Sequence, residues 1–145
     1  MMIRKANEFE IHYLLEWSVR LTEEMSLGYM KSNIHRTYDM VAKVLSKGGY
    51  YLVVQNKYGI VGWILLGMDQ NYYKNEIVGF IYELYVFPHY RKKGYGKVLM
   101  NHAVSQLRNS GVRTVQLNVF AGNPAKKMYE KMGFREVTSL MEKEI

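Results

Sequence analysis

An apolar run, a basic glycine-bearing turn and an amphipathic segment follow one another in the middle of the chain, and they restrict the fold most. The run IVGFIYELYV, Ile77 to Val86, predicts a buried strand. After Pro88 comes RKKGYGK, Arg91 to Lys97, and apolar residues then recur at helical spacing to about Ser110. This order brings free backbone N–H groups, the positive end of a helix and four cations together, which favours phosphate binding.

The glycines of this turn suit a pyrophosphate in particular. A pyrophosphate needs donors on several sides, and Gly94 and Gly96 let the backbone approach without obstruction by a Cβ atom. The neighbouring cations add favourable charge. The simpler interpretation is that a basic turn containing glycine only starts a helix.

Length and composition indicate one globular domain over residues 1–145. The absence of cysteine excludes disulfides, thiolate zinc sites and cysteine nucleophiles. The N-terminus lacks the apolar segment of a signal peptide, and no run of about 18 apolar residues is present to span a membrane. We therefore expect a cytoplasmic protein without a membrane partner.

The net charge of +7 favours an anionic partner of some kind. Nucleic acid, an acidic membrane face and a polyphosphate cofactor all fit this charge, and so does a basic surface with no specific role. The four histidines are scattered over different predicted elements, at spacings that assemble no metal site. We therefore expect no metal.

Hydrophobic patterns predict ten elements in the order β, α, α, β, β, β, α, β, α, β. They are a strand near Ile3, a helix from Asn7 to about Met25, a second helix from Ile34 that Gly48 and Gly49 stop, a hairpin of 50–54 and 60–66, the strand 77–86, a helix after Gly94, a strand at 115–119, a short helix after Asn123 and a last strand at 134–141. The helix between the strands at 77–86 and 115–119 predicts a parallel crossover.

Two motifs make the chain resemble the GCN5-related N-acetyltransferases, the GNAT superfamily. In ELYVFPHYRKKGYGKVLM, the residues Arg91, Gly94 and Gly96 fit the family's acetyl-CoA signature of Arg or Gln, two variable residues, Gly, one variable residue, and Gly or Ala. The second motif is NVFAGNPAKKMYEKMGF, which resembles the family's pattern at Asn123, Tyr129, Gly133 and Phe134.

The resemblance implies an α/β fold of the GNAT-like acyl-CoA N-acyltransferase type. Its sheet is expected to be mixed antiparallel and parallel, with six to seven strands flanked by about four helices. The implied activity is N-acetyl transfer from acetyl-CoA to a primary amine of a small molecule or peptide, with CoA as product. Homodimers are frequent in the family, so a homodimer is one expectation.

The resemblance also implies roles for individual residues. Tyr129 matches the tyrosine that protonates the departing CoA thiolate, and Glu83 is the candidate for deprotonating the amine through water. Core packing is the alternative for Tyr129, and a structural or substrate-orienting role is the alternative for Glu83. The expected cofactor-binding residues, on a bulged strand, on the basic turn and in the second motif, are Leu84, Tyr85, Val86, Arg91, Lys92, Lys93, Gly94, Tyr95, Gly96, Lys97, Asn118, Asn123 and Tyr129.

Two further functions and one acceptor site stay open on the sequence. The acceptor pocket is expected at Thr22 to Arg36 and Met68 to Glu76, where carboxylates and aromatic residues suit a cationic amine. A non-catalytic acyl-CoA-binding or regulatory module on the same fold is the first alternative function. A basic nucleic-acid binder is the second, although no recognition motif is visible and we expect no specific nucleic-acid partner.

Overall fold

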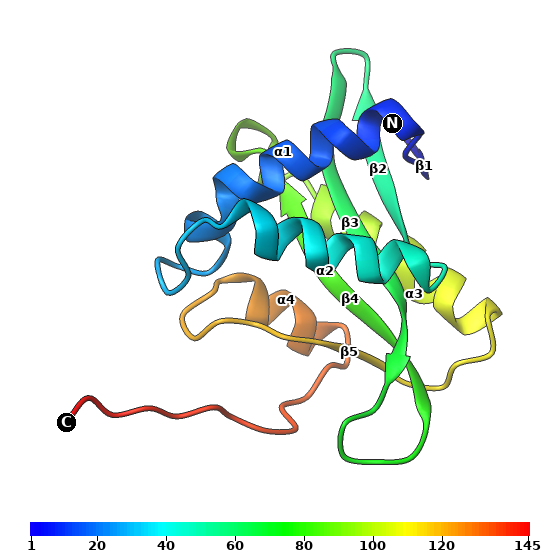
Figure 1. Cartoon of the computed structure of the whole chain (residues 1–145). Coiled ribbons are helices and arrows are strands. Elements are labelled where there is room, and N and C mark those ends of the chain that lie inside the picture. The colour runs from blue at the N-terminus through cyan, green and yellow to red at the C-terminus, as the bar shows by residue number, and fades with distance from the viewer.

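A computed structural model describes all residues, 1–145, and shows a mixed sheet between two layers of helices (Figure 1). The strands are β1 (Met2–Lys5), β2 (Tyr50–Asn56), β3 (Gly59–Gln70), β4 (Ile77–Val86) and β5 (Val115–Leu117), and the helices are α1 (Glu8–Met25), α2 (Ile34–Ser46), α3 (Tyr95–Asn109) and α4 (Ala125–Lys131), with a 3-10 turn at Pro88–Tyr90. The strands lie in the order β1-β2-β3-β4-β5. The first four are antiparallel, and β5 is parallel to β4.

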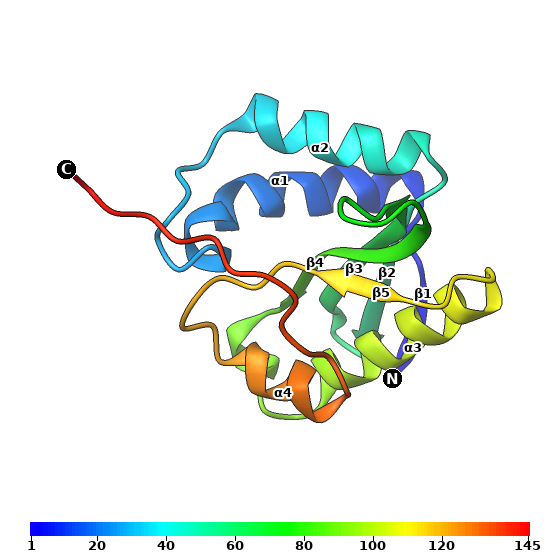
Figure 2. The ribbon, with the colours of Figure 1, turned by 90° about the horizontal axis from the view of Figure 1, so that it is seen from below.

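The helices divide between the two faces of the sheet. Figure 2 shows α1 and α2 on one side and α3 and α4 on the other. Side chains along β3 alternate accordingly: Trp63 and Leu65 pack in the cluster under α1 and α2, and Ile64 and Leu66 pack in the cluster with α3. None of the helices combines the length and apolarity needed to cross a bilayer.

The mixed sheet and the helices agree with the prediction, but the strand count does not. The sheet has five strands, not six to seven, because residues 134–141 pair with no other strand. Val137, Leu140 and Met141 are 63–94% exposed in this segment, which extends away from the sheet (Figure 1). A β-rich sequence alone does not form a strand where no neighbouring strand completes its hydrogen bonds.

Several strand boundaries also differ from the prediction, including the ends of β3 and β5. Met68 to Gln70 belong to β3 and pair with the start of β4, so the predicted loop is shorter at this end. At the other side of the sheet β5 ends at Leu117 rather than at Val119. The parallel crossover from β4 through α3 to β5 is confirmed.

A β-bulge in β4 changes which face its side chains occupy. Leu65 pairs with Glu83 and Leu66 pairs with Ile81, so Tyr82 is the extra residue. Before the bulge Ile81 packs in the cluster with α3; after it, Leu84 does the same. Tyr82 and Glu83 therefore both point to the α1 side. The bulge expected at Leu84 to Val86 is wrong, because those residues pair in regular register with β3.

The start of α1 is fixed to the sheet by a charged network. Asn7 Oδ1 accepts from the Glu10 N–H at 2.9 Å, and Glu10 Oε1 accepts from the Asn7 N–H at 2.9 Å, which forms a capping box. The Glu10 carboxylate also accepts two bonds of 2.7 Å from Arg4 on β1, whose guanidinium donates in turn to Gln55 on β2. The hydrogen bonds from Arg4 lower the pKa of Glu10 to about 2.

We expect Glu10→Gln to lower the free energy of unfolding by about 1–2 kcal/mol at pH 7, since Gln keeps the cap but loses the charged pair with Arg4. Because the pKa of Glu10 is depressed on folding, its contribution is complete above the unfolded value of about 4.3 and is lost as the pH falls towards 2. In urea titrations, the free energies of unfolding of Glu10→Gln and of the unmodified protein should therefore approach each other as the pH is lowered from 7 to 3. Glu8→Gln, at an exposed position of the same turn, is the control; a pH-independent difference would contradict this assignment.

Candidate active site

The two central strands separate next to the basic turn. β4 and β5 pair only from Gly79 to Ile81, and the pairing stops at the bulge. Beyond it the Phe87 N–H donates to the Val61 carbonyl of β3 at 2.9 Å. The backbone N–H and C=O groups of successive residues in an antiparallel strand point to alternate sides. Those of Leu84 and Val86 therefore point away from β3, to the side where no strand pairs with them. This edge of β4 offers the Leu84 N–H and carbonyl and the Val86 N–H to an extended ligand, while the Val86 carbonyl already accepts from Arg91 Nε at 2.8 Å.

The turn Arg91 to Lys97 presents its own free donors. Lys92 has a φ of 61° and Gly94 a φ of 87°, so two left-handed residues curl the chain ahead of α3. None of the backbone N–H groups from Lys92 to Lys97 donates a hydrogen bond within the chain, and the first helical bond runs from Val98 to the Gly94 carbonyl. Such a curled turn at the positive end of a helix suits a diphosphate.

Gly96 leaves an open surface beside this turn. A Cβ atom built there would meet Val86 Cγ2 at 3.9 Å and Met128 Cε at 4.0 Å, which are ordinary contacts. The packing of the chain itself therefore does not require glycine at this position. A ligand that approaches the backbone closely does require it.

The cations of the turn are not equivalent. Lys92, Lys93 and Lys97 are exposed and make no ion pair. Arg91 is held by the chain instead: its Nη2 donates to Glu24 Oε1 of α1 at 3.0 Å, and its Nε donates to the Val86 carbonyl at 2.8 Å. The three lysines are thus free to attract a phosphate, while Arg91 connects the turn to α1.

Tyr85 lies on the side of the sheet that faces α1, in contrast to its expected place at the cofactor. Its ring packs 5.1 Å from that of Trp63 and beneath the guanidinium of Arg91 at 5.1 Å. Its hydroxyl donates to Glu24 Oε2 at 2.9 Å. The backbone of Tyr85 belongs to the regular ladder with β3. We therefore find no part of this residue directed to the open edge of β4.

Glu83 is held by two buried donors. Ser18 Oγ of α1 donates to Glu83 Oε1 at 2.6 Å, and Trp63 Nε1 of β3 donates to the same oxygen at 2.5 Å. Although the residue keeps partial exposure, burial of its carboxyl raises the pKa of Glu83 above its usual range, and the bonds from Ser18 and Trp63 act in the opposite direction. A carboxyl with a raised pKa is suited to accept a proton.

The sequence prediction missed Ser18 and Trp63. A signal for Ser18 is present: Leu14, Ser18 and Thr22 recur every four residues, so hydroxyl side chains interrupt an apolar stripe of α1. Trp63 carries no comparable signal, because a tryptophan in an apolar strand is expected in the core whatever its N–H contacts. The Trp63 N–H meets Glu83 only because of the bulge in the neighbouring strand β4.

Tyr129 lies on the opposite side of the sheet from Glu83. It is 8% exposed, belongs to the core cluster with α3, and packs against Phe134 at 6.0 Å between ring centroids. Burial raises the pKa of Tyr129 to about 12, so the phenol stays protonated at neutral pH. The Tyr129 hydroxyl makes no hydrogen bond within the chain. Only the Tyr51 hydroxyl is both fully buried and without a partner, so the Tyr129 hydroxyl retains access to the surface.

The remaining predicted cofactor residues occupy varied positions. Asn123 Oδ1 accepts from the Ala125 N–H at 2.9 Å, so its side chain satisfies a free donor at the start of α4. Asn118 is exposed directly after β5, and Tyr95 packs partly buried in the first turn of α3. The side chain of Leu84 packs into the core, which leaves its backbone for the open edge.

The two segments of the predicted acceptor pocket do not come together. Tyr29 of the α1–α2 connection packs against Phe120, which follows β5, at 6.0 Å between centroids, so this segment borders the gap between β4 and β5. The β3–β4 connection, with the exposed Tyr72 and Tyr73, lies at the far end of β4. It is separated from Glu83 by about 20 Å of strand. An acceptor role for this half therefore stays a prediction, and only Asp69 of it is connected to the neighbourhood of Glu83, through the Tyr82 hydroxyl at 2.9 Å.

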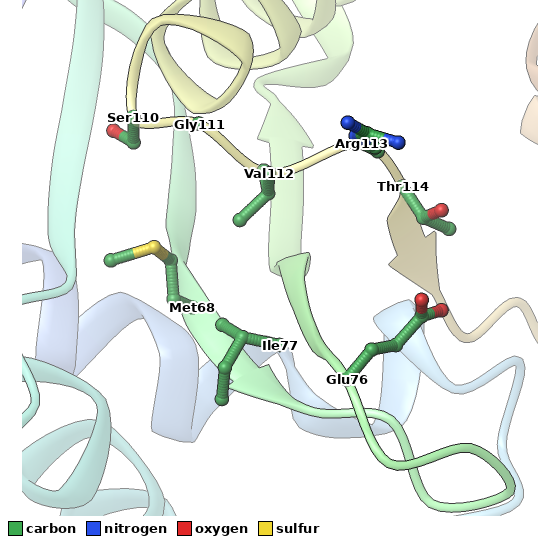
Figure 3. Close-up of a pocket in the computed structure, with 8 residues that line it drawn as sticks. All are labelled: Met68, Glu76, Ile77, Ser110, Gly111, Val112, Arg113 and Thr114. Carbon is green, nitrogen blue, oxygen red and sulfur yellow. The ribbon is translucent and has the colours of Figure 1, made fainter.

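A pocket of about 360 Å³ lies at this far end. Figure 3 shows Met68, Glu76 and Ile77 on one side of it and the segment 110–114 on the other. This segment follows the C-terminal end of α3, whereas the basic turn precedes its N-terminal end. A helix of 15 residues is about 22 Å long, so this pocket is separate from the candidate site.

Comparison with known proteins gives sequence relatives that share part of the chain. The N-acetyltransferase YycN of Bacillus subtilis, described as uncharacterized, is 35% identical over 91 residues, which cover 62% of this chain and 57% of that protein. The [ribosomal protein bS18]-alanine N-acetyltransferase of Haemophilus influenzae is 35% identical over 74 residues, 43% of this chain and 51% of that protein. The chain thus spans about half the length of the curated relatives it matches.

Solved structures and a family model cover more of the chain. A Pyrococcus furiosus protein assigned to the acetyl transferases superposes with a TM-score of 0.83 at 21% identity, over 99% of both chains. The aminoglycoside 6'-N-acetyltransferase AAC(6')-IG of Acinetobacter haemolyticus superposes with a TM-score of 0.74 at 18% identity, over 100% of this chain and 99% of that one. The model of the acetyltransferase (GNAT) family matches residues 10–134. The chain belongs to the GNAT family of acetyltransferases.

Proposed function

We propose that this protein is an N-acetyltransferase that moves the acetyl group of acetyl-CoA to a primary amine. The separation of β4 and β5 carries the proposal, because it forms an opening between Glu83 on one face of the sheet and Tyr129 on the other. The basic turn with its free N–H groups lies at the same end of β4. Residues 1–145 act as a single domain in this proposal, and the cytoplasm is the expected location.

The residues around the opening fit the parts of acetyl-CoA. The N–H groups and lysines of the turn from Lys92 to Lys97 would hold the diphosphate, and Gly96 would give it close approach. The open backbone edge at Leu84 and Val86 would pair with the amide groups of the pantetheine arm. Asn118 and Asn123 lie on the β5 side of the same opening and are proposed contacts of that arm.

Glu83 and Tyr129 would handle the two protons of the reaction. Acetyl-CoA supplies the acetyl group as a thioester. Glu83 takes one proton from the ammonium form of the acceptor, directly or through water, which frees the nitrogen lone pair to form the C–N bond. The nitrogen of the resulting adduct loses its second proton to solvent as the C–S bond breaks. Tyr129 gives its phenolic proton to the sulfur as the C–S bond breaks. Both side chains then regain their starting protonation by exchange with solvent.

The acceptor is proposed as the amine of a small molecule or of a peptide N-terminus. Several relatives are named as alanine N-acetyltransferases of ribosomal protein bS18, which supports a peptide N-terminus. An α-amino group has a reference pKa of about 8, so it needs less help from a base than a lysine-like amine. A screen of both classes of amine, followed by release of the CoA thiol, distinguishes them. Binding of acetyl-CoA without turnover of any amine would instead support the non-catalytic module.

We expect Gly96→Leu to weaken acetyl-CoA binding at least tenfold while the protein keeps its stability. The Cβ atom of the new side chain meets only ordinary contacts in the free protein, and its outer atoms would occupy the space of the ligand at the backbone. Isothermal titration calorimetry with acetyl-CoA measures the affinity. Asn101→Leu, at an exposed position of the same helix, is the control. Equal affinity of Gly96→Leu and the unmodified protein would place the cofactor elsewhere.

We expect Tyr129→Phe to lower kcat about 100-fold or more and to change the affinity for acetyl-CoA little, because the variant loses a proton donor and keeps the packed ring. Initial rates with an amine identified by the screen measure this effect. Tyr58→Phe, on the exposed β2–β3 turn, is the matched control. Full activity of Tyr129→Phe would remove its role as the acid.

A further inference from the structure

The two oxygens of the Glu83 carboxylate have different surroundings. Oε1 receives both short hydrogen bonds, from Ser18 at 2.6 Å and from Trp63 at 2.5 Å, and Oε2 receives none from the chain. Ser18 is 1% exposed and Trp63 0%, so packing fixes both donors. An oxygen that already accepts two such bonds has less capacity to bind a proton than one that accepts none.

We propose that Ser18 and Trp63 are positioning residues, which saturate Oε1 of Glu83 and leave Oε2 as the oxygen that takes the proton of the acceptor amine. This inference rests on the proposed function. In the step an N–H bond breaks, its electron pair stays on nitrogen, and the proton forms an O–H bond with Oε2. The two donors stay on Oε1 throughout, so the carboxyl keeps its orientation while it gains and loses the proton.

The orientation follows from three elements that meet at this point. α1 contributes Ser18, β3 contributes Trp63, and the bulge at Tyr82 turns Glu83 towards both. The indole of Trp63 has little freedom, because its ring packs at 5.1 Å from Tyr85. Rigid donors on separate elements fix a side chain more closely than donors on one mobile loop.

The other polar groups around Glu83 leave this assignment unchanged. On β2 the covered Tyr51 hydroxyl lies near both Ser18 and Glu83; burial and then the charge of Glu83 raise the pKa of that phenol, an interaction with Ser18 acts in the opposite direction, and the phenol stays neutral. On α1 the Glu24 carboxylate is paired with an arginine of the basic turn. On β4 the Tyr82 hydroxyl donates to Asp69 of β3 at 2.9 Å. α2 buries Val41, Val44 and the hydroxyl residue Thr37, none of which changes its charge near neutral pH.

Titration of the free, full-length protein tests the hydrogen bonds without any substrate. Glutamate labelled with ¹³C at the side-chain carboxyl gives a resonance for Glu83, which is assigned by its loss in Glu83→Gln. We expect Ser18→Ala to raise the titration midpoint of Glu83 by about one pH unit, because a donor to the charged form is lost. Trp63→Phe should raise it similarly. Unchanged midpoints in both variants would overturn the proposal.

The chain offers a matched control for each variant. Ser105→Ala removes an exposed hydroxyl from α3, and Trp17→Phe replaces the other tryptophan of the chain, whose N–H makes no hydrogen bond. Neither control should move the Glu83 midpoint. A shift of equal size in the controls would show a general change in the domain and would overturn the specific role of Ser18 and Trp63.

Turnover with an amine found by the screen tests the catalytic part. We expect Ser18→Ala to lower kcat several-fold near neutral pH and to leave the KM for acetyl-CoA unchanged. The acidic limb of its pH profile of kcat/KM should move to higher pH by the same amount as the titration midpoint of Glu83. A midpoint that moves while the acidic limb stays would overturn the proton-accepting role. Absence of turnover with every amine would refute the proposed function, whereas the hydrogen bonds are judged by the titration alone.

Discussion

The bulge at Tyr82 is the constraint on which the candidate site depends. Side chains of a strand alternate between its two faces, so one inserted residue exchanges the faces for everything that follows. Without it, Glu83 would point into the apolar cluster with α3, and Leu84 would point towards Ser18. The same bulge marks the place where β5 leaves β4. One residue thus orients the carboxylate and opens the sheet beside it.

The two apolar clusters make this irregular strand tolerable. A buried carboxylate is costly unless hydrogen bonds compensate for the lost water. Trp63 supplies a hydrogen bond and apolar packing at once, since its N–H donates to Glu83 and its ring packs with Tyr85 and Phe87. Tyr129 is fixed in the other cluster by packing alone. The site therefore combines one side chain held by hydrogen bonds with one held by apolar contacts.

Local signals in the sequence were sufficient for most of the fold. Asn7 with Glu10 marks the start of α1, and the run from Arg91 to Gly96 marks the turn before α3; both depend on residues close together in the chain. The bulge is a property of two strands, because it consists in an offset between β3 and β4, so the pattern of one strand does not reveal it. The missing strand at 134–141 has the same cause, since a strand requires a partner.

The side chain of Arg91 has a consequence for the protein before any ligand binds. An open strand edge displays unpaired carbonyl and N–H groups and invites pairing with a second chain, which leads to aggregation. The guanidinium of Arg91 occupies the Val86 carbonyl on this edge, and the adjacent lysines surround it with positive charge that repels a like copy. The residues proposed to hold an anionic ligand thus also favour the colloidal stability of the free protein.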